Sequence, residues 1–135
     1  MENASLSYLL ARLPVAISML GHGLARLPKL DKFSNWMVGQ FQQSILPDEL
    51  VRPFSYMLPF LELNIGLLLL VGLFMRVSLV TGSIVILVLI FGSCMLEQWE
   101  NVAIQMFYGL YFAGLLFFQD KYNQYSLDYK LRGRS

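Results

Sequence analysis

The sequence predicts an all-α integral membrane four-helix bundle, with an amphipathic interfacial segment between spans one and two. Four stretches approach the roughly 20 apolar residues that cross a bilayer core. Of the 135 residues, 56% are hydrophobic. Only 14% are charged, against about 25% in an ordinary soluble domain. These charges are too few to cover the surface of a water-soluble monomer, and the length allows a single domain, residues 1–135.

The charge balance excludes one class of partner. Ten Lys and Arg residues nearly cancel nine Asp and Glu residues, whereas nucleic-acid binding needs a basic face. We therefore expect the lipid bilayer, and no nucleic acid, as a partner. One cysteine, Cys94, and one histidine are too few ligands for a self-contained zinc, haem or iron–sulfur site, so we expect no metal and no intrinsic cofactor.

The first predicted span, residues 6–27, is the weakest because Arg12, His22 and Arg26 interrupt it. The only charge before its apolar run is the acidic Glu2, and no small-residue cleavage site follows. Because this is not the layout of a signal peptide, we expect a retained span.

The long connection that follows, residues 28–53, has two interpretations. Apolar residues recur in it at helical spacing, at Leu30, Phe33, Met37, Phe41 and Ile45, with Trp36 beside them. This pattern is typical of an amphipathic helix in the membrane interface, which we expect Pro47 to stop. Asp48 and Glu49 suit the start of a short helix leading to Pro53. The alternative is a loop that covers the mouth of the bundle.

Three further spans are predicted. Residues 54–75 contain Glu62 and Asn64, residues 77–96 carry no charge, and residues 102–119 are also uncharged. Small residues four positions apart suggest where helix backbones approach each other. These pairs are Ser78 with Gly82, Gly109 with Ala113, and Gly21 with Ala25.

Four spans place both termini on one side of the membrane. That side would carry Arg76, Lys121, Lys130, Arg132 and Arg134, with Arg12 close to it, against Arg26, Lys29, Lys32 and Arg52 on the other side. The positive-inside rule then favours cytoplasmic termini by a small margin. Three tyrosines after the last span, Tyr122, Tyr125 and Tyr129, fit a tail pressed against the headgroups.

Polar residues inside the spans define the candidate site. An ionisable side chain near the bilayer centre costs about 2.5–3.5 kcal/mol, so it normally faces the bundle interior. The helical rise places Glu62 about 12 Å and His22 about 7.5 Å from the outer ends of their spans. Gln105 and Tyr108 lie at about 6 Å and 10 Å on the fourth span by the same rise. These four residues predict a polar pocket in the outer half of the bundle.

The basic residues of the first span are expected to face inward together. At 100° per residue, Arg12, His22 and Arg26 fall within about 80° of one another. Arg12 lies about 10 Å deeper than Glu62, which disfavours a direct ion pair. We expect its guanidinium to reach the cytoplasmic headgroups instead.

Structural roles remain open for each candidate. Glu62 could be a neutral acid hydrogen-bonded between helices, and His22 a packing histidine rather than a proton-handling one. Arg26 could be an interfacial anchor. Packing or interfacial roles suit Gln105 and Tyr108, and Cys94 fits a small apolar packing position.

Several short motifs together resemble the DoxX family of small four-span membrane proteins. They are Arg12, the run GHGLAR ending at Arg26, Glu62 within LPFLELNIG, and YSLD from Tyr125 to Asp128. By this resemblance Arg12, His22, Arg26 and Glu62 match recurrent polar positions of the family, although Lys is common where Arg26 stands. Gln105 and Tyr108 come from depth alone.

The resemblance implies a component of the bacterial plasma membrane linked to quinone chemistry, since the family is related to the DoxD subunit of archaeal thiosulfate:quinone oxidoreductase. The first hypothesis is therefore an oxidoreductase-associated subunit that binds a quinone-like or other small apolar molecule. Because family members also resemble a eukaryotic chaperone for ion channels, the second is a non-enzymatic membrane scaffold or assembly factor. Because few residues project far from the membrane, we expect a homo-oligomer or a hetero-complex with a redox or membrane partner. A transporter fits less well, because four-span drug exporters carry their membrane glutamate on the first span.

Overall fold

The protein is described by a computed structural model that covers residues 2–133, none of which lies in a strand. Its helices are α1 (Glu2–Arg26), the short 3-10 helix η1 (Leu27–Lys29), α2 (Leu30–Gln40), α3 (Asp48–Val71), α4 (Met75–Met95), α5 (Trp99–Tyr122) and α6 (Leu127–Arg132). The segments built on α1, α3, α4 and α5 are long and apolar enough to cross a membrane. The predicted all-α membrane fold with four spans is confirmed.

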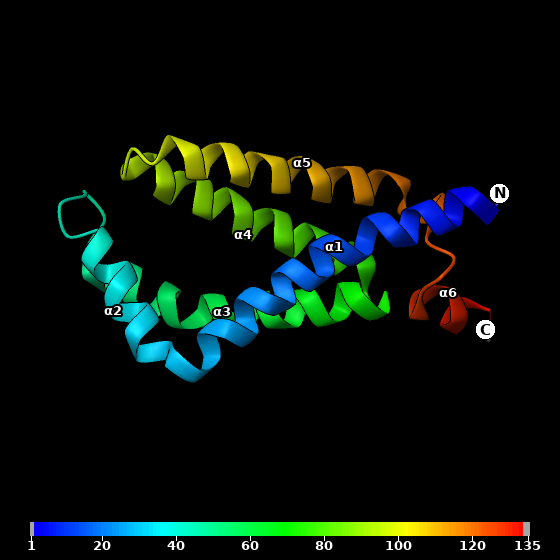
Figure 1. The fold of residues 1–135 in the computed structure, drawn as a ribbon, viewed down its shortest axis with the longest axis horizontal. Coiled ribbons are helices and arrows are strands. Elements are labelled where there is room, and N and C mark those ends of the chain that lie inside the picture. Colours follow the sequence, from blue (N-terminus) through cyan, green and yellow to red (C-terminus); the bar gives the residue numbers. More distant parts are fainter. Residues whose placement is uncertain (1, 134–135) are drawn as a thin grey trace.

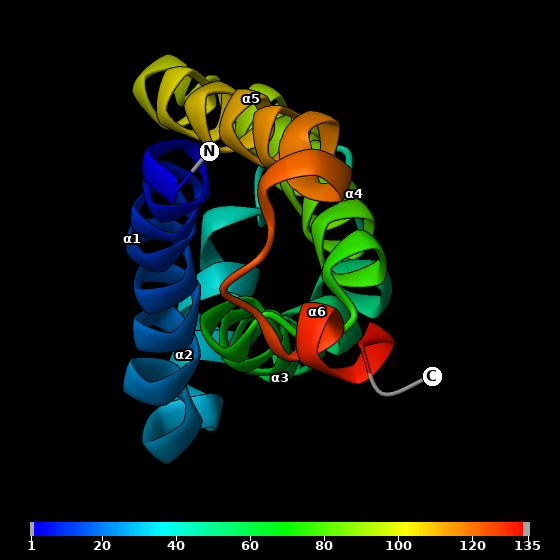
Figure 2. The ribbon, with the colours of Figure 1, turned by 90° about the vertical axis from the view of Figure 1, so that its right-hand side faces the viewer.

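The four long helices form two pairs, α1 with α3 and α4 with α5. The end-on view in Figure 2 shows them arranged around a centre in the order α1, α3, α4, α5. The pairs lie close together at the end that holds both chain termini, and they diverge toward the other end, where α2 lies (Figure 1). This divergence leaves room inside the bundle at the end away from the termini.

The contact between α1 and α3 depends on two glycines. A Cβ atom added at Gly23 would lie 2.7 Å from the backbone nitrogen of Leu63, and one added at Gly66 would overlap the backbone of Leu20. Gly21, predicted to be at a helix contact with Ala25, has nothing within 4 Å of such an atom. That prediction is wrong because Gly23, two residues further along the helix, lies on the face that meets α3.

The other two predicted small-residue pairs do involve a helix contact. A Cβ atom added at Gly82 of α4 would lie 3.2 Å from the ring of Phe112, and one added at Gly109 of α5 would lie 3.6 Å from the Ile86 side chain. Phe112 is fully buried. Small residues on both helices therefore allow α4 and α5 to pack closely.

Tyrosine hydroxyls join the two helix pairs where α1 meets α5. Tyr8 donates to the Leu115 carbonyl at 2.7 Å, Tyr111 donates to the Ala11 carbonyl, and Tyr108 shares a hydrogen bond with Ser18. Each bond satisfies a hydroxyl group that would otherwise be unpaired in an apolar environment. This row of bonds fixes α5 against α1 from the end near the termini to the level of Ser18.

The connection between the first two spans contains a helix packed on the bundle. Phe33, Met37 and Val38 of α2 are buried, and Ser34 and Ser55 share a hydrogen bond of 2.6 Å between α2 and α3. The helix ends at Gln40, earlier than the predicted stop at Pro47, and turns follow it.

The second span begins earlier than expected and contains the predicted short helix. Asp48 is the first residue of α3, which continues without a break through Pro53 and Pro59. Prolines inside a helix are tolerated in membrane spans because neighbouring groups satisfy the freed carbonyls. The same helix stops at Val71 rather than at residue 75, because Gly72 adopts a left-handed conformation with φ 73° and ends it.

Arg12 does not reach toward headgroups, and the sequence-based expectation is wrong. Its side chain is 2% exposed, donates from Nη1 to the Asn123 side-chain oxygen at 2.7 Å, and donates from Nη2 to the Tyr125 carbonyl at 3.0 Å. These acceptors are available because the segment after α5 folds back across the end of the bundle (Figure 2).

The C-terminal segment also caps α4. Asp128 accepts hydrogen bonds from the backbone N–H groups of Phe74 at 2.8 Å and Met75 at 2.9 Å. A carboxylate at this position satisfies the unpaired N–H groups of a helix start and complements its partial positive charge. Tyr125 and Tyr129 are exposed on this segment. Their contact with the lipid headgroups stays a prediction.

A candidate membrane-embedded cavity

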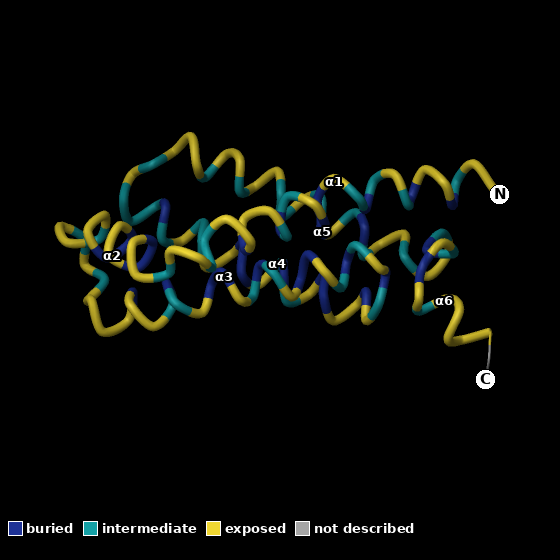
Figure 3. The backbone as a smooth tube through the Cα atoms, turned by 60° about the horizontal axis from the view of Figure 1, so that its bottom comes forward, coloured by how far each residue is buried: buried dark blue, intermediate teal, exposed yellow. Residues whose placement is uncertain are grey.

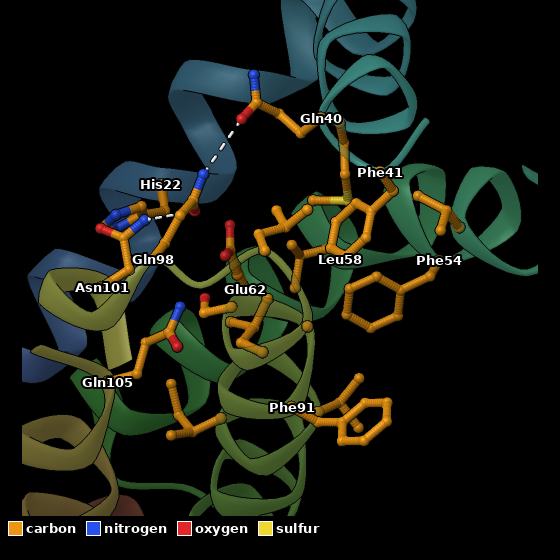
Figure 4. Close-up of a pocket in the computed structure, with 18 of the residues that line it drawn as sticks. His22, Gln40, Phe41, Phe54, Leu58, Glu62, Phe91, Gln98, Asn101 and Gln105 are labelled. Atoms are coloured by element: carbon orange, nitrogen blue, oxygen red, sulfur yellow. Dashed lines mark hydrogen bonds between the residues drawn. The ribbon is translucent and has the colours of Figure 1, made fainter. Parts of the chain in front are cut away.

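The divergent end of the bundle encloses a cavity of about 460 Å³, lined by residues of α1 to α5. This volume lies within the range of sites that bind small molecules. Figure 4 shows that its two sides differ: His22 and Gln105 lie on one side, and Phe54 and Phe91 on the other. Buried and exposed residues alternate along the surrounding helices (Figure 3), as expected when one face of each helix lines the interior.

An ion pair between α1 and α3 lies in the wall of this cavity. Nη1 of Arg26 donates to both carboxylate oxygens of Glu62, at 2.8 Å and 3.0 Å. Glu62 is 4% exposed, and the Arg26 guanidinium lies over the ring of Phe33 at 4.4 Å from its centroid. The buried acid is therefore paired with a cation that α2 holds in position, as an intramembrane charge requires.

His22 lies on α1, one helical turn before Arg26, and its geometry defines its tautomer. Its Nδ1 atom lies 2.6 Å from the backbone carbonyl oxygen of Ser18. Because a carbonyl oxygen only accepts, Nδ1 must carry the hydrogen and donate it. The remaining nitrogen, Nε2, accepts a hydrogen bond in neutral His22 and donates one when the ring is protonated.

The fourth span contributes two polar side chains to the cavity wall. Tyr108 is bonded to Ser18, so its hydroxyl is already paired within the bundle. Gln105 also lines the cavity, and its buried Oε1 atom has no hydrogen-bond partner among the residues that the structure describes. An unpaired buried acceptor is uncommon in folded proteins and calls for an explanation such as a missing donor.

The structure thus brings together all but one of the candidate residues. His22, Arg26, Glu62, Gln105 and Tyr108 line the same cavity. Arg12 lies at the opposite end, bonded to the C-terminal segment. Helical depth predicted that four of these residues lie together, because the helical rise places them at similar levels. The four are His22, Glu62, Gln105 and Tyr108.

Sequence reasoning missed the polar residues that close the outer end of the cavity. Asn101 donates to Gln98 at 2.9 Å, and Gln98 donates to Gln40 at 3.2 Å, as the dashed lines in Figure 4 show. This chain joins the end of α2 to the start of α5. Its members lie at helix ends and in connections, where no periodicity signals a contact between residues so far apart in sequence.

Phe41 makes a second contact across the same end. Its ring would lie 3.2 Å from a Cβ atom placed at Gly92 of α4. Phe41 and Gly92 both line the cavity. The end of α2 and the residue after it therefore contact α4 and the connection before α5, and they cover the cavity at this end.

Four apolar helices around a cavity, polar on one side and aromatic on the other, define a small integral membrane protein with a cavity in its bundle. The sequence model of the DoxX family matches residues 7–93, well over half of the chain, and the protein belongs to this family. The match includes Arg12, His22, Arg26 and Glu62, while Gln105 lies beyond it. Comparisons with curated proteins and with solved structures found no significant match.

Proposed function

We propose that this DoxX protein binds a quinone, or a similar small apolar molecule with a polar head, and serves as the membrane subunit of an oxidoreductase. One observation carries the proposal: a cavity within the membrane-spanning bundle places His22, Glu62 and Gln105 beside an apolar, aromatic side. A ligand that combines a polar head with an apolar body is complementary to both sides.

The polar side has hydrogen-bonding groups available for such a head. Gln105 presents an unpaired buried Oε1 acceptor, which suits a hydroxyl group of a quinol. His22 Nε2 can accept from a hydroxyl when neutral or donate to a carbonyl when protonated. Arg26 bonds to Glu62 through Nη1, and a guanidinium has further N–H donors that suit a quinone carbonyl. Both redox forms of a quinone could therefore find partners.

A quinone that is reduced gains two electrons and two protons. In this proposal the electrons come from a redox partner or from a diffusing reductant, and the chain handles the protons. His22 and Glu62 are the two groups of the cavity wall suited to holding a proton close to a bound carbonyl. Arg26 orients the Glu62 carboxylate and supplies the positive charge that stabilises it.

Binding can be measured through the protein's own fluorescence. Trp36 lines the cavity, and in a Trp99→Phe background it is the sole tryptophan. A short-chain quinone titrated into the purified protein should quench it. Glu62→Gln should weaken this binding at least about tenfold, since loss of one charged partner costs more than about 1.4 kcal/mol. Glu100→Gln, which changes an exposed acid of α5, should leave it unchanged.

The result that contradicts the proposal is unaltered quenching by Glu62→Gln protein that accumulates normally in the membrane. If Glu62→Gln proves unstable, Gln105→Leu offers a second variant, because it removes the unpaired acceptor without breaking the ion pair. Mass spectrometry of gently purified protein provides an independent measurement, since a co-purifying quinone supports this function.

A second candidate is a scaffold or assembly factor for other membrane proteins. Only Phe112 and Leu115 of the 24 residues of α5 are buried, so most of this helix presents apolar side chains outward. Such a face can pack against another membrane helix as well as against lipid. A stoichiometric membrane protein in the same mass spectra, without a small ligand, favours this candidate, and either function is compatible with a homo-oligomer or a hetero-complex.

We also propose residence in the bacterial plasma membrane with cytoplasmic termini. Both ends of the described chain lie at one end of the bundle (Figure 1), and this end holds more Lys and Arg residues, although Arg134 lies outside the described residues. The charge difference supports this orientation. A reporter that is active only in the cytoplasm, fused to the C-terminus, should be active, and an inactive reporter would contradict the orientation.

A further inference from the structure

We infer that the molecule bound in the cavity carries an apolar chain, which leaves the cavity laterally between α3 and α4 into the bilayer. The inference rests on the proposed function and narrows its ligand class to quinones, or related amphiphiles, with a prenyl or alkyl chain. It also assigns the rim of this portal to Leu50 of α3 and to Val88 and Phe91 of α4.

The divergence of the helices creates the portal. α3 and α4 are joined by the short turn after Gly72 and separate from there toward the other end of the bundle (Figure 1). The cavity is lined by the first half of α3, including Phe54, and by the second half of α4, including Leu89. The cavity therefore lies where these two helices are farthest from their connecting turn.

Exposure shows that the cavity is continuous with the outside on this side. Leu50, Val88 and Phe91 line the cavity, yet they are 60%, 46% and 54% exposed. Side chains with both properties stand at the rim of an opening. Trp36 of α2 and Ile104 of α5, each 58% exposed, also have both properties, so the choice of the α3–α4 side rests on its apolar lining. In a span that crosses a membrane, the surroundings of that rim are lipid chains.

The opposite side of the cavity is unsuited to an apolar chain. His22, Asn101 and Gln105 lie between α1 and α5 (Figure 4), and deeper in the bundle the hydrogen bond between Ser18 and Tyr108 closes this seam. A methylene chain placed there would offer no hydrogen bond to these polar groups and would shield them from other partners, which is unfavourable. The head of the ligand therefore belongs on the α1–α5 side and its chain on the α3–α4 side.

The outer end of the cavity is bridged as well. Gln98 bonds to Gln40 at 3.2 Å, and Phe41 contacts Gly92, so α2 and the segment after it span the gap between the helix pairs. A ligand already dissolved in the bilayer can enter sideways and leave its chain among lipids. Lateral entry avoids transferring that chain through water, which is strongly unfavourable for each methylene.

The test narrows the portal with a bulky residue and compares two probes. Val88→Trp and Leu50→Trp place a large ring at the two rims. Val80→Trp is the matched control, because Val80 is 41% exposed on the same helix but does not line the cavity. Binding of a decyl-chain benzoquinone and of the same ring without a chain is measured in lipid nanodiscs, with empty nanodiscs as the blank.

The portal predicts that each rim variant weakens binding of the decyl quinone about tenfold or more and leaves the chainless ring unchanged. Val80→Trp should affect neither probe. Equal effects on both probes, or no effect on either, would overturn the portal while leaving the proposed function in place. Wild-type protein that binds only the chainless ring would overturn the chain requirement. Binding of neither probe would reject the proposed function itself, and with it the portal.

Discussion

Arg12 and Asn123, 111 positions apart in the chain, are joined by a 2.7 Å hydrogen bond that links α1 to the segment after α5. The bond lies at the end of the bundle opposite the cavity. A buried guanidinium and two of its acceptors thereby close the end of the bundle near the termini, which gives a charged residue in the first span its polar partners.

Replacing Arg12 should release the C-terminal segment. Arg12→Met leaves the Asn123 side chain and the Tyr125 carbonyl without this donor, and hydrogen bonds to charged groups contribute about 1.5–3 kcal/mol each. We expect a lower thermal unfolding midpoint in detergent and faster trypsin cleavage after Lys130. Arg76→Met, at an exposed position of α4, serves as the control, and equal cleavage rates in both variants would contradict this role.

Adding one methyl group at Gly23 should disrupt the α1–α3 pair. The new Cβ would lie 2.7 Å from the backbone nitrogen of Leu63, and overpacking of this kind costs about 1–3 kcal/mol. Gly21→Ala, on the same helix with nothing within 4 Å, should be neutral or slightly stabilising. Thermal unfolding followed by circular dichroism should therefore show a clearly lower midpoint for Gly23→Ala than for the wild type. The midpoint of Gly21→Ala should be unchanged or slightly higher.

Asp128 should stabilise the start of α4. Asp128→Ala removes the acceptors for the Phe74 and Met75 N–H groups, and loss of a helix cap costs about 0.5–2 kcal/mol. Asp120→Ala, at an exposed position of α5, should change stability by less than about 0.5 kcal/mol. Hydrogen exchange at the first turn of α4 should accelerate only in Asp128→Ala, and equal exchange in the two variants would argue against capping.

Replacing Arg26 should destabilise the protein more than replacing its partner Glu62. Arg26→Met leaves the buried Glu62 without its cation, for which about 3–5 kcal/mol is typical. Glu62→Met leaves Arg26, whose side chain is 27% exposed, able to reach polar surroundings, so its cost should be smaller. The double variant should be less destabilised than the sum of the single ones. Additive losses in unfolding experiments would show that the pair contributes no coupling.

The membrane fold was predictable from the sequence because it depends on the length and polarity of local stretches. The helical rise, counted from the ends of these stretches, also placed Glu62 and His22 at similar depths on adjacent helices. Helix ends were less predictable. Gly72 ends α3 by its left-handed conformation, while Pro53 does not interrupt the helix at all, and apolar runs alone do not distinguish these outcomes.

The hydrogen-bond partners of Arg12 could not be predicted from the residues around it in the sequence. Depth and helical face gave its position correctly as inward, but its partners come from residues after the last span. A segment that returns across the bundle leaves no periodic signal in the sequence. The same holds for Gln40 and Gln98, whose bond joins two connections that are separated by two complete spans.

The divergence of the two helix pairs separates the end that secures the fold from the end that contains the cavity. Arg12, Asp128 and the turn at Gly72 secure the end near the termini, whereas cavity residues such as Gln105 and Phe91 lie toward the opposite end. Substitutions that reshape the cavity can therefore accumulate without loosening the secured end. The shape and polarity of the cavity can thus change through a few side chains, with the same four helices retained.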